Sequence, residues 1–229
     1  MFIELEASPA RGSADHEVIP NALLREWPKE VFELIKPHLR RVSFAGGDEL
    51  VVPGQASNDV FFVGQGAIAA IWSKGALRFQ AYLIGSEGCG GFTDWLTESP
   101  SCYQYRALVG GYLYKLEGAV LATALACSDR VSRSMSLYGA QVLNEIAETG
   151  AFTAAPARNR VARLVLSLIE RTGVNQLTIT QSEIASTLGL QRTTVCGVAR
   201  ELSKQGAMSY MRGKLKIKNR EILEAYAVC

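Results

Sequence analysis

The segment 180–206, TQSEIASTLGLQRTTVCGVARELSKQG, constrains the fold of this chain more than any other. Counting Gln181 as the first position, Ala185 is fifth, Gly189 ninth and Val195 fifteenth. A small fifth residue lets two helices cross closely, glycine supplies the positive φ of a tight turn, and a branched residue anchors the second helix. Three positions with separate steric requirements predict a helix-turn-helix. An ordinary helical hairpin is the alternative.

Charge is spread unevenly along the 229 residues, although the net charge is only +2. Residues 1–150 hold 12 Lys and Arg against 17 Asp and Glu, a net of −5. Residues 151–229 hold 12 Lys and Arg against 5 Asp and Glu, a net of +7. A positive face attracts phosphates through electrostatic steering and counterion release. Because the basic third also contains the helix-turn-helix pattern, the two signals together favour DNA binding.

Composition argues against several other classes of protein. The sequence has no apolar run of about 18 residues and no apolar stretch of the kind that a secretory signal needs, so we expect a cytoplasmic protein without membrane contact. Five scattered cysteines without a CxxC pair predict free thiols. The histidines are His16 and His38 alone, too few for a multi-histidine metal enzyme. We expect no metal, no cofactor and no enzymatic activity.

Glycine punctuates residues 42–116 at close intervals, between short apolar runs such as DVFFV, AIAAIW and YLYKL. This spacing of strands and turns is typical of a small all-β sandwich or jelly roll. A cupin-type enzyme would have a similar fold, but its metal needs histidine ligands on the strands. Since 42–116 contains no histidine, the sequence predicts a non-enzymatic jelly-roll domain in an α+β protein.

Changes in composition along the chain suggest where the domains begin and end. We expect a flexible N-terminus over 1–27, a jelly-roll domain over 28–118 and a dimerisation helix region over 119–150. Residues 151–229 are expected to form a winged helix-turn-helix domain. Its wing is a β-hairpin predicted around Arg212 and the glycine after it.

A long helix is predicted over 129–150, with apolar residues at spacings of 4, 3, 4 and 4. These residues are Val131, Met135, Tyr138, Val142 and Ile146. The spacing approximates a coiled-coil seam. Packing of the same residues on the β domain of their own chain is the alternative. We prefer a two-stranded dimer seam, because a helix-turn-helix protein usually needs two half-sites.

The order of helix, glycine-rich β domain, long helix and winged helix-turn-helix resembles the CRP/FNR family of bacterial transcription regulators. The resemblance covers about residues 28–226. It is strongest over LTITQSEIASTLGLQRTTVCGVARELSKQGAMSYMRGKLKI, and GQASNDVFFVGQGAIAAI is similar to the opening of the family's sensor domain, which is cyclic-nucleotide-binding-like. The family implies a homodimer on double-stranded DNA with a palindromic operator, and RNA polymerase as a further candidate partner. A ligand-binding module that regulates a protein partner is the alternative, but the basic C-terminal third argues against it.

The resemblance implies that one recognition helix per half-site enters the major groove. The residues expected at the DNA are Thr180, Gln191, Arg192, Thr193, Thr194, Gly197, Arg200, Lys204, Arg212 and Lys214. Arg192 is the expected base reader, since a guanidinium can pair with O6 and N7 of guanine together. Residues at helix starts and the later cations are expected phosphate contacts. For Arg200 and Lys204, a solvated helix face is the alternative.

Two positions of the expected recognition helix depart from the family pattern. Thr193 stands where many members carry an acidic base reader, and Gly197 where many carry a second arginine. Both departures imply an operator unlike the usual family site. Glycine inside a helix costs about 1 kcal/mol relative to alanine. Close approach to DNA or tight helix packing would each account for Gly197.

The motif that holds cyclic nucleotides in this family is degraded. Members use a Gly-Glu pair for the ribose and a later Arg-Ser/Thr pair for the phosphate. Here Ser101 and Cys102 fall at the arginine pair, and Gly90 and Gly91 fall where the glutamate is needed. A buried phosphate would then lack its cationic partner. We expect no response to cyclic AMP unless a shifted alignment uses Arg106, and the effector is unknown or absent.

Overall fold

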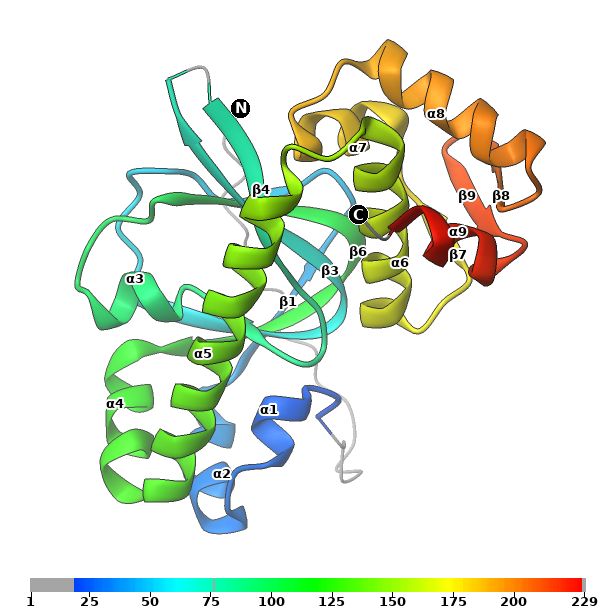
Figure 1. Ribbon diagram of the computed structural model, residues 1–229. Coiled ribbons are helices and arrows are strands. Elements are labelled where there is room, and N and C mark those ends of the chain that lie inside the picture. The colour runs from blue at the N-terminus through cyan, green and yellow to red at the C-terminus, as the bar shows by residue number, and fades with distance from the viewer. Residues whose placement is uncertain (1–18, 76, 228–229) are drawn as a thin grey trace.

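The computed structural model describes residues 19–75 and 77–227, so most of the flexible N-terminus expected over 1–27 lies outside the described residues. An N-terminal β domain and a C-terminal helical domain are joined through one long helix (Figure 1). The N-terminal domain and the long helix contain these elements: α1 (Ala22–Arg25), α2 (Lys29–Ile35), η1 (Lys36–His38), β1 (Arg40–Phe44), β2 (Glu49–Val51), β3 (Asp59–Lys74), β4 (Leu77–Ile84), β5 (Cys89–Gly90), α3 (Phe92–Leu96), β6 (Tyr103–Glu117), α4 (Gly118–Cys127) and α5 (Asp129–Phe152).

The strands of the N-terminal domain form a six-stranded antiparallel sheet in the order β1-β6-β3-β4, with β2 beside β6 and β5 beside β3. Both β3 and β6 are long because each merges two strands that glycines were expected to separate. Register shifts near Gly66 and Gly111 bend the pair instead. At Gly111 a Cβ atom would lie 2.0 Å from the carbonyl oxygen of Gln65. Glycine therefore permits a close approach of the two backbones at the bend.

Strand β3 is buried on both faces because its alternate side chains enter two different cores. Ile68 and Ala70 belong to the core inside the N-terminal domain, whereas Ala67, Ala69 and Ile71 belong to a core shared with the C-terminal domain. Successive side chains of a strand point to opposite faces. This accounts for the uninterrupted apolar run in β3, because a strand with one solvated face would alternate apolar and polar residues.

The segment around α1 is packed, which differs from the flexibility expected over 1–27. The Asn21 side chain is fully buried and caps α1. Its amide nitrogen also donates to the carbonyl oxygens of Val63 and Gly88, at 2.9 and 2.8 Å. Trp27 is only 4% exposed. A buried amide that satisfies three backbone groups fixes this segment against β3.

Helix α5 packs its apolar face on the sheet of its own chain, which corrects the expected dimer seam. The Tyr138 hydroxyl donates to the carbonyl oxygen of Cys89 at 2.7 Å. Near-heptad spacing also describes an amphipathic helix on a sheet, so the sequence pattern could not separate the two arrangements. The expected seam residues belong to the monomer core or pack against it: Val131, Met135, Tyr138, Val142 and Ile146.

A different face of α5 is open to solvent. Leu137 and Leu143 are 55% and 68% exposed. Ala140 and Ala147 are also exposed and lie at helical spacing from these leucines. Residues three and four apart share one face of a helix, so the four side chains form an apolar stripe on the side of α5 away from the sheet.

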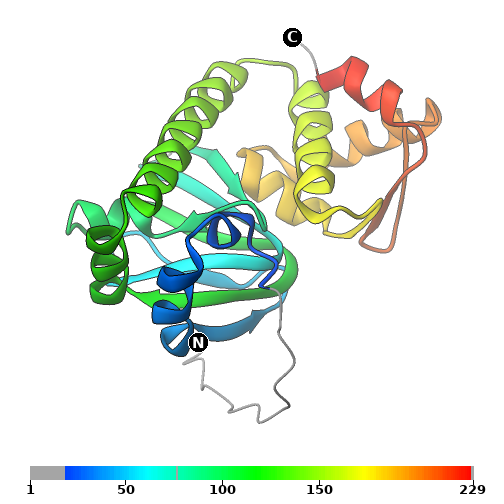
Figure 2. The ribbon, with the colours of Figure 1, turned by 90° about the horizontal axis from the view of Figure 1, so that it is seen from below.

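The C-terminal domain is a three-stranded sheet, in the order β7-β9-β8, surrounded by helices. Pro156 precedes α6, and Gly173, with φ +68°, ends it. Figure 2 shows α6 beside the end of α5. The elements are α6 (Ala157–Thr172), β7 (Gln176–Thr178), α7 (Gln181–Leu188), α8 (Arg192–Lys204), β8 (Met208–Met211), β9 (Lys214–Ile217) and α9 (Arg220–Ala227).

Candidate DNA-binding surface

Helices α7 and α8 form the predicted helix-turn-helix. A capping box begins α7: the Thr180 hydroxyl accepts from the Glu183 N–H at 3.1 Å, and the Glu183 carboxylate accepts from the Thr180 N–H. Gly189 ends α7 with φ +63°. The N–H of Leu190 then donates to the carbonyl oxygen of Ala185 at 2.9 Å. Gly189 therefore has the turn role that predicted it, and Ala185 and Val195 are both buried in the domain core.

The two faces of α8 differ sharply. Val195, Val198 and Leu202 are buried in the core of the C-terminal domain. Arg192 and Arg200 lie on the exposed face. In Figure 1 α8 lies at the edge of the molecule, away from the N-terminal sheet. The helix thus exposes its polar face and packs its apolar face on the domain core, as a recognition helix requires.

A groove of about 790 Å³ runs between the start of α7, the exposed side of α8 and the wing. It brings together half of the residues expected at DNA: Thr180, Arg192, Arg200, Lys204 and Arg212. The wing is the β8–β9 hairpin, with Arg212 and Gly213 both at positive φ in its turn. Three successive elements of the chain therefore converge on one basic groove.

The other expected residues lie around this groove, and all of them are exposed: Gln191, Thr193, Thr194, Gly197 and Lys214. A Cβ atom at Gly197 would meet no atom within 4 Å. Tight packing within the protein therefore does not account for this glycine. Close approach of an external partner is the remaining explanation of the two.

The groove also contains residues that the sequence reasoning missed. Cys196 and Ser203 line it from α8, Gln181 and Ser182 from the start of α7, and Tyr210 from the wing. Helical spacing from Arg192 and Arg200 could have identified Cys196 and Ser203. The strand pairing that places Tyr210 beside the groove has no comparable local signal.

The cations in and around the groove differ from most other arginines of the domain, which pair with carboxylates. Arg220 pairs with Glu170 and Glu224 at 2.5 and 2.6 Å. Within residues 19–75 and 77–227, no carboxylate lies within 4.0 Å of the charged nitrogens of these five side chains: Arg192, Arg200, Lys204, Arg212 and Lys214. An unpaired and exposed cation is free to replace condensed counterions on a phosphate backbone.

The residues at the expected cyclic-nucleotide motif have other partners. Ser101 is buried, its hydroxyl donates to the carbonyl oxygen of Tyr103 at 3.0 Å, and its N–H donates to Gln55. Arg106 forms an ion pair with Glu49 at 3.5 Å. It follows Tyr105, which points into the domain core, so the Arg106 side chain leaves the opposite face of the strand. Neither residue is placed to hold a phosphate inside the domain.

Tyrosines occupy the interior beside this motif. The hydroxyls of Tyr82 and Tyr105 are 3.0 Å apart, and the Gly91 N–H donates to the Tyr105 oxygen at 3.3 Å. Burial is the main influence on the pKa of both phenols and raises it well above its usual value. Burial likewise raises the pKa of Tyr103 to about 12. All three hydroxyls therefore stay neutral, and those of Tyr82 and Tyr105 are satisfied by each other and by the Gly91 N–H.

The fold and the basic groove define a two-domain protein with a winged helix-turn-helix DNA-binding domain. Residues 159–226 match the Crp-like helix-turn-helix domain family. The antiparallel β domain, the long helix and this domain follow one another in the same order as in solved structures of CRP/FNR regulators, so the chain has a Crp-like helix-turn-helix domain within a CRP/FNR-type fold. The predicted α+β architecture is confirmed at this level. Among curated proteins no sequence matches the chain.

Several solved structures share the fold at low sequence identity. FixK2 from Bradyrhizobium japonicum has a TM-score of 0.71 and 17% identity, over 83% of this chain and 98% of its own. TTHB099, a CRP-family transcriptional regulator from Thermus thermophilus, has a TM-score of 0.64 and 18% identity, over 82% of this chain and 96% of its own. The c-di-GMP responsive regulator CLP from Xanthomonas campestris has a TM-score of 0.66 and 15% identity, over 83% of this chain and 99% of its own. Within the described residues, no helix has the length and apolarity to cross a membrane.

Proposed function

We propose that the protein acts as a homodimer on a palindromic operator, with one α8 helix in the major groove of each half-site. The carrying observation is the basic groove, in which unpaired cations from α8 and the wing surround the exposed side of the recognition helix. Arg192, in the first turn of α8, is the proposed base reader, because its guanidinium is exposed and can bind guanine bidentately. The remaining groove cations contact phosphates. A contact with RNA polymerase stays a prediction.

The apolar stripe on α5 supports the dimer and replaces the seam expected from sequence. Leu137 and Leu143 are large apolar side chains on a surface that otherwise alternates with polar residues. Two copies of α5 packed along this stripe would bury both leucines, with alanines allowing close contact. The dimer axis then runs beside the C-terminal domains, and each domain supplies one recognition helix.

The sensor region supports a regulator that does not respond to cyclic AMP. A cyclic phosphate needs a cation and free N–H groups. Arg106 pairs with Glu49 outside the core, and the Gly91 N–H is bonded to Tyr105. Calorimetry with cyclic AMP should give only the heat of dilution, and saturable micromolar binding would overturn this part of the proposal.

Selection of bound DNA from a random pool, followed by a salt series on the selected site, tests the function. Specific binding should weaken steeply with salt, and the selected site should contain two inverted half-sites. Arg192→Ala should relax selectivity at one base pair in each half-site, at a cost of about 1–3 kcal/mol. Arg25→Ala removes the same charge from α1 and is the control. Weak binding without sequence preference would contradict the proposal.

A further inference from the structure

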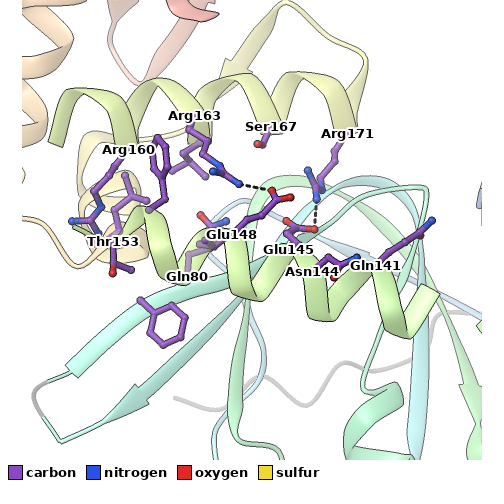
Figure 3. A pocket seen from close by; sticks show the side chains of 15 residues that line it. Gln80, Gln141, Asn144, Glu145, Glu148, Thr153, Arg160, Arg163, Ser167 and Arg171 are labelled. Carbon is purple, nitrogen blue, oxygen red and sulfur yellow. Dashed lines mark hydrogen bonds and ion pairs between the residues drawn. The ribbon is translucent and has the colours of Figure 1, made fainter. Parts of the chain in front are cut away.

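A pocket of about 350 Å³ lies where the two domains meet, between α5, α6 and β4 (Figure 3). It is distinct from the basic groove and from the expected cyclic-nucleotide motif. Its walls are amphipathic: Phe79 and Phe152 supply apolar surface, and Gln80, Gln141 and Asn144 supply amides. Pockets of about 300–1,000 Å³ with apolar walls and a few polar groups hold small molecules.

The pocket has one more cation than it has carboxylates. Arg163 pairs with Glu148 at 3.0 Å, and Arg171 pairs with Glu145 at 2.7 Å. The third arginine, Arg160, lies at the opposite end from Arg171 in Figure 3. Its guanidinium donates to the carbonyl oxygen of Leu188, and within the described part of the chain it has no carboxylate partner.

The environment of Arg160 favours an added anion. The residue is half-buried, and burial lowers the pKa of its guanidinium. A partly desolvated cation without a counter-ion gains more from an anion than an exposed one does, because water screens the attraction less. A carboxylate or phosphate can accept two parallel hydrogen bonds from the arginine fork.

We propose that this pocket binds a small amphipathic anion, with its carboxylate or phosphate group on Arg160 and its apolar body against Phe79 and Phe152. Arg163 and Arg171 pair with carboxylates, whereas within the described residues Arg160 does not, so the lining leaves one cation available to one negative charge. The volume of about 350 Å³ fits a molecule of one or two rings.

The position of Arg160 gives the pocket a route to the helix-turn-helix. Leu188 is the last residue of α7, and Gly189 begins the turn that leads to α8. A cation on the last carbonyl of a helix stabilises that end. An anion that breaks the hydrogen bond between Arg160 and the Leu188 carbonyl therefore removes a contact that stabilises the end of α7 and the turn after it. This regulatory part rests on the proposed function, whereas the binding site itself does not.

Binding can be measured without DNA, using anilinonaphthalene sulfonate, an aromatic anion that fluoresces in apolar pockets. Phenylacetate and phenyl phosphate should each compete for its site, and the stronger competitor distinguishes a carboxylate from a phosphate ligand. Benzyl alcohol, with a similar body and no charge, should not compete. Arg160→Ala should weaken dye binding at least tenfold, or about 1.4 kcal/mol, while Arg160→Lys retains most of it. Arg25→Ala should leave it unchanged.

Circular dichroism should show that each variant keeps its fold. Equal dye affinity in wild type and Arg160→Ala, or competition by benzyl alcohol as strong as by the anions, would overturn the site. A second arm measures affinity for the selected operator with and without saturating competitor. A shift in wild type that is absent in Arg160→Ala supports the regulatory route, and identical shifts overturn it. If neither protein binds DNA while dye binding still depends on Arg160, the proposed function fails and the site stands.

Discussion

Gly197 is the residue of α8 whose identity the protein interior leaves unexplained. A Cβ atom at this position meets nothing within 4 Å, so Gly197→Ala should fold without strain. We expect the free energy of unfolding to rise by about 1 kcal/mol, because alanine loses less backbone entropy in a helix. Affinity for the operator should fall if DNA approaches the helix here. Thermal unfolding and a binding titration measure the two effects, and unchanged affinity would argue against close approach.

Arg171 and Glu145 form a partly buried ion pair between the two domains. Arg171 also contacts Glu87, at 3.1 Å. Burial is the strongest influence on Glu145 and raises its pKa, while Arg171 lowers it. Arg171→Ala leaves the carboxylate without this cation. We expect the free energy of unfolding, measured with urea, to fall by about 1–3 kcal/mol.

That loss should depend on pH. Without Arg171, the pKa of Glu145 in the folded state lies further above its unfolded value of about 4.3. The folded protein then holds a proton that the unfolded chain has released, so stability falls as pH rises through this range. The deficit of Arg171→Ala should be larger near neutral pH than at about pH 4. Adding Glu145→Gln should remove most of the pH dependence, and its persistence would assign the effect to another group.

At the scale of single residues, the sequence predicts the turn and the recognition helix well, because Ala185, Gly189 and Val195 have local steric roles. The pocket cation Arg160 carries no such signal. Its importance depends on a carbonyl 28 residues away and on the absence of a carboxylate beside it within the described chain. Neither fact is encoded in local spacing.

Helix α5 has two apolar faces with different expected roles. Met135→Ala removes a side chain that is 1% exposed in the core, so it should lower the free energy of unfolding by about 2–5 kcal/mol. Leu137→Glu with Leu143→Glu places charges on the exposed stripe and should convert dimer to monomer with little loss of monomer stability. Sedimentation and urea unfolding measure these outcomes. An unchanged dimer would place the interface elsewhere.

The same helix illustrates a limit of pattern analysis. Both faces of α5 carry apolar residues at spacings of three and four, and the more regular set predicted the dimer seam. Which face a helix buries depends on the shape of the sheet beneath it. Strands β3 and β6 are similar, because the glycines that predict turns in an isolated strand become bends when two long strands pair across them.

At the scale of the whole molecule, the two domains share a core. Ala69 is fully buried on the face of β3 that belongs to it. Ala69→Asp places an unpaired charge there, which costs several kcal/mol and should loosen the contact between domains. Limited proteolysis in the connection after α5 should then be faster than in wild type. Ala122→Asp, at an exposed position of α4, is the control, and equal cleavage of all three proteins would show that the contact does not protect the connection.

The burial of β3 on both faces also affects whether the two domains can be produced separately. Small side chains at Ala67 and Ala69 give the sheet a flat apolar patch that fits its own α6. A sheet domain expressed alone would present that patch to water and self-associate. A chimera that joins this DNA-binding domain to a foreign sensor would need a matching patch of small residues. The two halves are separate in sequence, yet they are not interchangeable parts.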